Sequence, residues 1–439
     1  MTAFGTSSAL LAVPYVFATL SLPMAAMPSE APGGADSAST VLANGIVVLT
    51  RERKGADVIA LQVLVGSGAR DEADDQAGAS KLWEQLMTQG TPTRPTPGEV
   101  LRHFSITGGM IGTRATWETF WLSTIARGPD FPEALNVLSD ILLNSGTTDE
   151  FVERGRRISL DDVARRKNAP ARWIRDVQVE ELYGRELARR TPAGDPESLQ
   201  SLTPSALRRF HAEHFRGGNM IVAVVGNISH EDAVSQVSAA LGGVPAGARP
   251  SRVPLPPLQA KPIWKEIKAG TDQAEVVLSV PAVGRLHPDY YPLLIYDRIM
   301  GLPSGPLFGE VRDRYGLAYS VGSGITAFRE TGDWSISAGT AAGNAERLRD
   351  IALDQVRSMR DERITQASVD AIKTYLLGTF VVGLEQYSDD AMALAQLAWN
   401  GQTLDDHRAK IRAVTADDVQ RVVRTYLDPD KFLAVVLRP

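Results

Sequence analysis

The chain has 439 residues, enough for about three average domains or two large ones, and its 44% hydrophobic and 22% charged residues exclude a fibrous or disordered protein. Lys and Arg number 46 against 52 Asp and Glu, and the resulting net charge of −6 disfavours nucleic acid or anionic lipid as a partner. Because cysteine is absent, a disulfide framework, a thiolate zinc site, an iron–sulfur cluster and a cysteine nucleophile are all excluded.

The first 40 residues differ in composition from the rest. An apolar run over residues 9–20, followed by a stretch of small residues, predicts an export signal and a disordered segment, although no Lys or Arg precedes Arg51. Pro14 and Pro23 interrupt the run, which falls short of the about 20 apolar residues that span a membrane. We therefore expect a periplasmic bacterial protein without stable membrane insertion, with a cytoplasmic location as the alternative.

The same order of elements occurs twice along the chain. Each half begins with two strands, predicted at 46–50 and 58–65 and again at 263–268 and 274–280, and the second pair leads into a helix at 289–300. Each half closes with a Thr-capped helix and an apolar strand, predicted at 203–215 and 220–225 and again at 415–427 and 432–436. This repetition predicts a tandem duplication.

The spacing of these elements predicts an α+β fold. We interpret the early strands of each half as hairpin-like pairs, so we expect two tandem homologous domains, each a mainly antiparallel sheet packed with helices. Six prolines within residues 242–262 prevent a helix and predict an extended linker. The expected organisation is a leader at 1–40, domains at 41–241 and 263–439, and the linker at 242–262.

Common catalytic motifs are missing from the sequence. It contains no G-x-S-x-G motif and no Gly-Lys-Ser/Thr phosphate loop, and the glycines of the segment 301–309 predict a turn. His211 and His214 flank Glu213 in the wrong order for a zinc helix. We interpret these histidines as half-buried side chains of an ordinary amphipathic helix.

One segment of the first half carries a family resemblance. The sequence GSGARDE at 66–72, followed by GASKLWEQLMTQGT at 78–91, resembles the zinc-helix region of the M16 metallopeptidases, which include pitrilysin, insulysin and mitochondrial processing peptidase. In that family the helix carries H-x-x-E-H, with two zinc ligands and a carboxylate that deprotonates the zinc-bound water. Lys81 and Gln85 occupy the two histidine positions, Glu84 remains, and Asp162 matches the third ligand, a Glu in the family.

Helical spacing places the polar residues of this segment on one face. That face contains Lys81, Glu84, Gln85 and Thr88, and the apolar face contains Leu82, Trp83, Leu86 and Met87. An ammonium group repels a divalent cation and has no lone pair to donate. We therefore expect a degenerate site with a Lys81–Glu84 helical pair, no metal and no cofactor in this chain.

The second half retains a different part of the family pattern. Residues 306–321 are similar to the M16 segment with an Arg/Tyr pair, and Arg312 and Tyr319 stand seven residues apart as in the family. There the Tyr donates a hydrogen bond to the scissile carbonyl oxygen and the Arg contacts the substrate. Arg314 is interpreted as a surface residue. Residues 108–113 match the family's substrate-lining strand, but Gly112 replaces its Asn, so peptide binding by this strand is not expected.

The resemblance implies a subunit of a split bacterial M16B heterodimer. Zinc is expected in the partner, a homologous M16 subunit carrying H-x-x-E-H, and Arg312 and Tyr319 of this chain would complete the active site for hydrolysis of peptide substrates. This chain alone would be inactive. The alternative is a non-catalytic scaffold or a substrate-guiding adaptor of an M16-like complex, which needs no such donor pair.

Overall fold

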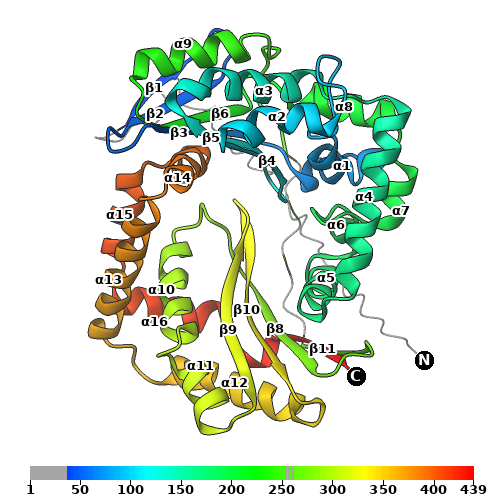
Figure 1. The fold of residues 1–439 in the computed structure, drawn as a ribbon. Helices are drawn as coiled ribbons and strands as arrows, with labels where there is room; N and C mark the ends of the chain where they lie inside the picture. Colours follow the sequence, from blue (N-terminus) through cyan, green and yellow to red (C-terminus); the bar gives the residue numbers. More distant parts are fainter. Residues whose placement is uncertain (1–36, 253–254, 256–257, 259–261) are drawn as a thin grey trace, which may run out of the picture.

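Two β-sheets, each packed with helices, form the two halves of the molecule (Figure 1). The computed structural model describes residues 37–252, 255, 258 and 262–439. The first sheet has the order β1-β2-β6-β3-β5-β4, with β1 Ala38–Val41, β2 Val47–Glu52, β3 Val58–Val65, β4 Met110–Ala115, β5 Phe120–Arg127 and β6 Met220–Gly226. The second has the order β7-β11-β8-β10-β9, with β7 Ile263–Lys268, β8 Ala274–Val283, β9 Ala318–Ala327, β10 Thr331–Thr340 and β11 Leu433–Arg438. The α+β prediction is confirmed.

The two sheets share one strand order, apart from the additional β1. The closing strand of each half lies inside its sheet: β6 between β2 and β3, and β11 between β7 and β8, parallel to the first and antiparallel to the second of each pair. The predicted hairpin-like pairing of the early strands is therefore wrong, although most strand pairs are antiparallel. A central strand is covered on both faces, which explains why β6 is buried along its whole length.

Helices occupy the connections between strands. Those of the first half are α1 Ala79–Leu86, α2 Pro97–Thr107, α3 Phe131–Asn144, α4 Asp149–Lys167, α5 Pro170–Tyr183, α6 Arg185–Arg189, α7 Pro196–Ser201, α8 Pro204–His214 and α9 His230–Leu241. Those of the second half are α10 Tyr290–Gly301, α11 Pro306–Phe308, α12 Ala345–Asp361, α13 Gln366–Gly383, α14 Tyr387–Trp399, α15 Leu404–Ala413 and α16 Ala416–Tyr426. Thr203 and Thr415 cap α8 and α16 by accepting backbone N–H bonds, as the sequence predicts.

The fold begins earlier than residue 41, because β1 starts at Ala38, inside the segment expected to be a leader. The predicted export signal lies outside the described residues, and so does part of the predicted linker. Of the helices that the structure describes, none is singly long and apolar enough to cross a membrane; α13 and α14 meet that test only as a pair bent by 117°.

Each half covers one face of the other half's sheet with a helix. Helix α14 packs its apolar residues, including Leu394 and Trp399, on the inner face of β2, β3 and β6. Helix α5 packs Ile174 and Val177 on β8 and β11 of the second sheet. Helix α5 is the second helix of the consecutive pair α4–α5, and α14 is the second helix of the pair α13–α14. The exchange buries sheet faces that would otherwise be exposed, so neither half encloses its core alone.

A buried carboxyl group joins α5 to the second sheet. Asp333 on β10 accepts hydrogen bonds from Tyr183 Oη, at 2.6 Å, and from Gln178 Nε2, at 3.0 Å. Burial raises the pKa of Asp333 from 3.8 to about 6, against the opposing effect of these bonds. The folded chain therefore takes up a proton here as the pH falls from 7 to 5, and this group adds stability at pH 5 that it does not provide at pH 7.

Asp333→Asn is expected to remove this pH dependence, because an amide does not titrate. Between pH 7 and pH 5 the free energy of unfolding of the native chain should rise relative to that of the variant by about 1 kcal/mol. Urea denaturation of both proteins at the two pH values measures the difference. If the free energies of unfolding of the native chain and the variant differ by the same amount at pH 7 and at pH 5, the carboxyl group does not titrate in this range.

Candidate active site

A π-helical turn, Gly309–Arg314, positions Arg312. Its guanidinium carbon lies 4.8 Å from the centre of the Tyr319 ring and 4.6 Å from that of the Phe308 ring, so the cation is held against aromatic faces. Within the described part of the chain its one ion-pair contact is the weak 4.0 Å approach to Asp313. Most donors of this guanidinium thus remain for a ligand. Arg314 lies on the surface and pairs with Glu310.

A β-bulge aims Tyr319 into solvent. Ala318 pairs with Thr340 and Val321 with Ala338, so two residues of β9 stand opposite one residue of β10. Without the extra residue, Tyr319 would point to the same side as the buried Val321. With it, Tyr319 is 84% exposed. The bulge therefore places a free phenol beside Arg312.

The degenerate zinc positions cluster around α1. Both carboxylate oxygens of Glu72 accept backbone N–H bonds at the start of this helix, from Gly78 and Ser80, each at 2.7 Å. The Lys81 side chain is 7% exposed, and its Nζ lies 2.8 Å from Asp162 Oδ2 on α4. Glu84 Oε2 accepts the Ala115 N–H of β4 at 3.1 Å.

The expected Lys81–Glu84 pair is corrected by this geometry, because Lys81 bonds Asp162 instead. Helix α4 packs against α1, and the Glu84 carboxylate is turned towards β4. Burial raises the pKa of Glu84, while the charge of Lys81 opposes that rise. For Asp162, burial acts to raise the pKa, but the hydrogen bond and charge of Lys81 outweigh it and the pKa is lowered.

Zinc does not fit this donor set. The Lys81 ammonium group is hydrogen-bonded to the carboxylate of Asp162, and Gln85 has an amide where the family has an imidazole. Glu84 is then the single carboxylate left as a possible ligand. Among the described residues, three His, Cys, Asp or Glu side chains nowhere come together in a metal-binding group. Lys81 thus supplies beside Asp162 the positive charge that a metal ion would bring.

The histidine pair of α8 is part of the packing. His211 Nε2 contacts the Leu142 carbonyl at 2.9 Å, and its ring stacks on Phe215. His214 Nδ1 lies 2.8 Å from Ser67 Oγ. Burial lowers the pKa of both imidazoles, which favours their neutral forms. The structural interpretation of these histidines is confirmed.

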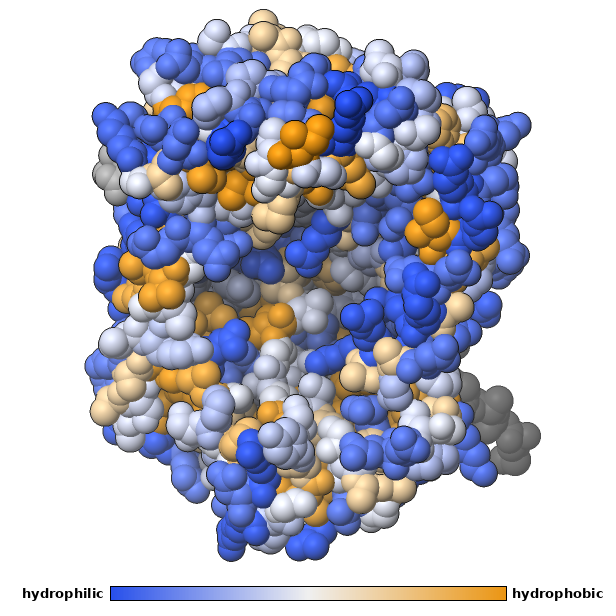
Figure 2. Space-filling model, viewed as in Figure 1, coloured by the Kyte–Doolittle hydropathy of each residue, from blue (hydrophilic) through white to orange (hydrophobic). Residues whose placement is uncertain are grey.

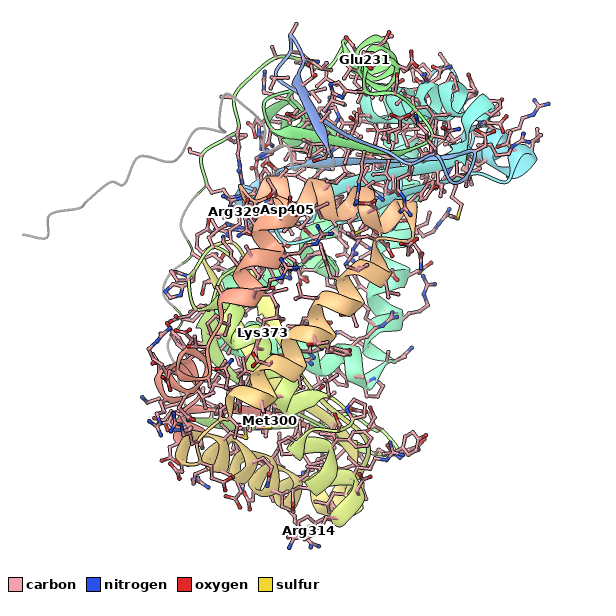
Figure 3. All side chains as sticks on the ribbon, turned by 90° about the vertical axis from the view of Figure 1, so that its left-hand side faces the viewer. Glu231, Met300, Arg314, Arg329, Lys373 and Asp405 are labelled. Atoms are coloured by element: carbon pink, nitrogen blue, oxygen red, sulfur yellow. The ribbon has the colours of Figure 1, made fainter. Side chains whose placement is uncertain are left out.

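The residues around α1 and the Arg312–Tyr319 pair lie far apart in the structure. Tyr319 stands near the start of β9, and eight residues of strand, about 26 Å, separate it from Ala327 at the end that faces the first half. In Figure 3, Arg314 lies at the far tip of the second half, while Arg329, which follows β9, lies close to the first sheet. Glu84, bonded to β4, belongs to that first half.

The bulge and the Glu72 cap were missed from the sequence. A bulge depends on the register between two paired strands, and the spacing of residues along the sequence does not reveal that register. The cap had a signal, since an acidic residue stands six positions before Gly78, the residue that precedes α1.

Family comparisons match both halves of the chain. Residues 47–191 match the model described as insulinase (peptidase family M16), and residues 201–376 match the model described as the peptidase M16 inactive domain. An uncharacterized zinc protease of Streptomyces coelicolor is 27% identical over 407 residues, which are 90% of this chain and 88% of that protein.

Two further proteins match over most of their length. The probable mitochondrial-processing peptidase subunit beta of Schizosaccharomyces pombe is 27% identical over 414 residues, with 90% of each chain covered. The crystal structure of a protease from Helicobacter pylori superposes with a TM-score of 0.85 at 20% identity and covers 92% of this chain and 99% of that chain. The fold is thus shared with that protease.

Proposed function

Because the chain belongs to the M16 family of peptidases, we propose that it is the zinc-lacking subunit of a heterodimeric metallopeptidase. A homologous partner with an intact H-x-x-E-H helix would supply the zinc. This chain would contribute Arg312 and Tyr319 to a shared site for hydrolysis of peptide bonds. The observation that carries the proposal is the pairing of an exposed Tyr319 with a guanidinium 4.8 Å from its ring, in a chain whose own α1 holds Lys81.

Tyr319 and Arg312 suit the stabilisation of an oxyanion. The phenolic O–H would donate a hydrogen bond to the carbonyl oxygen of the scissile bond as negative charge develops there. Arg312, held by ring faces, keeps planar N–H donors available for a backbone carbonyl of the substrate. The distance between this pair and α1 of the same chain supports a site completed by a second subunit.

The purified chain is expected to bind no stoichiometric zinc and to cleave no peptide, because Lys81 neutralises Asp162 and two imidazoles are absent. Metal analysis after dialysis against a weak chelator, with a peptidase assay on the same sample, tests both points. One zinc per chain retained after dialysis would contradict the degenerate-site assignment. The double variant Lys81→His, Gln85→His is a matched control that restores the two missing imidazoles.

Mixing the chain with its zinc-bearing homologue is expected to give a 1:1 heterodimer. Stable interfaces of this kind bury more than about 1,000 Å². Exposed apolar side chains are available for it, among them Ile106, Met110 and Val382. Sedimentation velocity at micromolar concentration measures the association, and two independently sedimenting species would refute it.

The adaptor function is the second candidate. The Lys81–Asp162 ion pair fits it equally well, because a scaffold needs no metal. It assigns no role to Tyr319, so substitution of that tyrosine separates the two functions.

A further inference from the structure

A cavity of about 570 Å³ lies between the two halves. Its walls come from the edge strand β4 and the turn after it, from the end of β9, and from α14. Figure 2 shows the surface hollowed between the upper and lower halves, where these elements meet. The cavity is separate from the Arg312–Tyr319 pair, which lies at the opposite end of β9.

Two arginines give the cavity a positive charge. Arg114 is exposed at the end of β4, where its charge opposes the raised pKa of Glu84, and among the described residues no carboxylate lies within ion-pair distance of Arg114 or Arg285. Arg285 Nε donates to the Ala327 carbonyl at 3.0 Å, which holds its guanidinium at the end of β9. The one acidic lining residue, Glu118, is already neutralised by Arg70, at 2.7 Å, and by Arg252, at 3.2 Å.

One further feature of the cavity concerns hydrogen bonding to the peptide backbone. Gln62 lines the cavity with a side-chain oxygen that is buried without a hydrogen-bond partner. Such a group gains from a ligand that brings a donor N–H.

Strand β9 connects the cavity to Tyr319. It is an edge strand, so one row of its backbone N–H and C=O groups has no neighbouring strand among the described residues. Gly322 and Gly324 bring no side chain to it, and a Cβ at either position would meet nothing within 4 Å. An extended peptide can add to such an edge through backbone hydrogen bonds, whatever its side chains.

We propose that this cavity anchors the C-terminal carboxylate of a peptide substrate through Arg114 and Arg285, and that the peptide runs along β9 to Tyr319. The inference rests on the proposed function for its cleavage step and on this chain alone for its binding step. The packed rings of Trp117 and Phe328 lie at the end of β9 in the cavity. A peptide on this strand therefore ends there, and its C-terminus, not its middle, meets the arginines.

The length of β9 then determines the position of cleavage. From Tyr319 to Thr326 there are seven residues of strand, about 23 Å, and an extended peptide advances by the same rise per residue. The scissile bond therefore lies about seven residues before the C-terminus of the substrate. The substrates of this site are peptides, or flexible protein tails, with a free C-terminal carboxylate.

The binding step is tested with the full chain and no partner. The probe is a fluorescein-labelled peptide of twelve Ala, Ser and Gln residues, made with a free C-terminal carboxylate or with an amide, and fluorescence anisotropy gives the dissociation constant. The amide is expected to bind at least about 10-fold more weakly, because a charge-assisted pair is lost. Arg114→Gln and Arg285→Gln should each weaken the carboxylate form about 5- to 10-fold and leave the amide unchanged.

The matched control is Arg412→Gln, an exposed arginine of α15 outside the cavity, which should bind both peptides as the native chain does. An amide peptide with one internal Glu tests whether a side-chain carboxylate can replace the terminal one. If the carboxylate and amide forms bind with equal affinity, or if neither binds at millimolar concentrations of the protein, the proposed binding of the C-terminal carboxylate is overturned. Equal affinity for the internal-Glu peptide overturns the assignment to the C-terminus.

The cleavage step is tested in the mixture with the zinc-bearing partner. Peptides extended at the C-terminus by one to four Ala residues should be cut at bonds shifted by the same number of residues, as read by mass spectrometry. If the cut stays at a fixed distance from the N-terminus, the path from the cavity to Tyr319 does not determine the cleavage position, and this part of the proposal is overturned. If the mixture cleaves nothing, the proposed function fails, while the carboxylate preference of the isolated chain is judged separately.

Discussion

Tyr319→Phe in this chain, assayed with an unaltered zinc-bearing partner, is expected to lower kcat by about 10²-fold. The substitution removes one hydroxyl group that would donate to the developing oxyanion, and loss of one such donor typically costs about 10²- to 10³-fold in rate. The side chain is 84% exposed and contacts Arg312 through its ring, which Phe retains. Folding, association with the partner and zinc content of the complex should therefore be unchanged.

Arg312→Ala is the companion experiment. A guanidinium that binds substrate in the ground state as well as in the transition state should act on KM as well as on kcat. Arg314→Ala, a surface substitution two residues away, serves as the control and should leave both constants unchanged. Full activity of a well-folded Tyr319→Phe heterodimer would eliminate the shared site and leave the adaptor function.

Trp399→Ala is expected to lower the free energy of unfolding by about 3–5 kcal/mol, the usual cost of deleting a large buried aromatic side chain. Trp399 is 2% exposed at the end of α14 and packs on the first sheet and against Gly66. The Arg249 guanidinium lies 3.3 Å from its ring centre, and burial lowers the pKa of this arginine to about 9. Removing the indole leaves both a cavity and a half-buried cation without its aromatic partner.

Urea denaturation followed by circular dichroism measures this loss. Because α14 and α5 cover each other's sheets, both halves should unfold in one transition at a lower urea concentration. Tyr375→Ala, on the exposed face of α13, is the control and should change stability by no more than about 0.5 kcal/mol. Two separate transitions in the native chain would contradict the interlocked arrangement.

The candidate site was only partly predictable. The residue types at 81, 84, 85 and 162 already exclude a zinc ligand set, because coordination depends on lone pairs and charge that each side chain carries in any fold. Pairing depends on position in space, and Lys81 therefore bonds Asp162, 81 residues away, where helical spacing favoured Glu84. The seven-residue spacing of Arg312 and Tyr319 was visible in the sequence, but the bulge that turns Tyr319 outward was not.

The sequence by itself determined the α+β class and the strands and capped helices that close each half, and it predicted the duplication and the loss of the zinc ligands. These follow from local periodicity, capping residues and side-chain chemistry, which depend on near neighbours in the chain. Only the tertiary structure decided that β6 and β11 enter the centres of their sheets, that α5 and α14 exchange partners, and that a positive cavity lies at one end of β9. Sheet order, helix exchange and cavities arise from contacts between distant residues, chosen by the burial of whole apolar faces, and no local pattern encodes that choice.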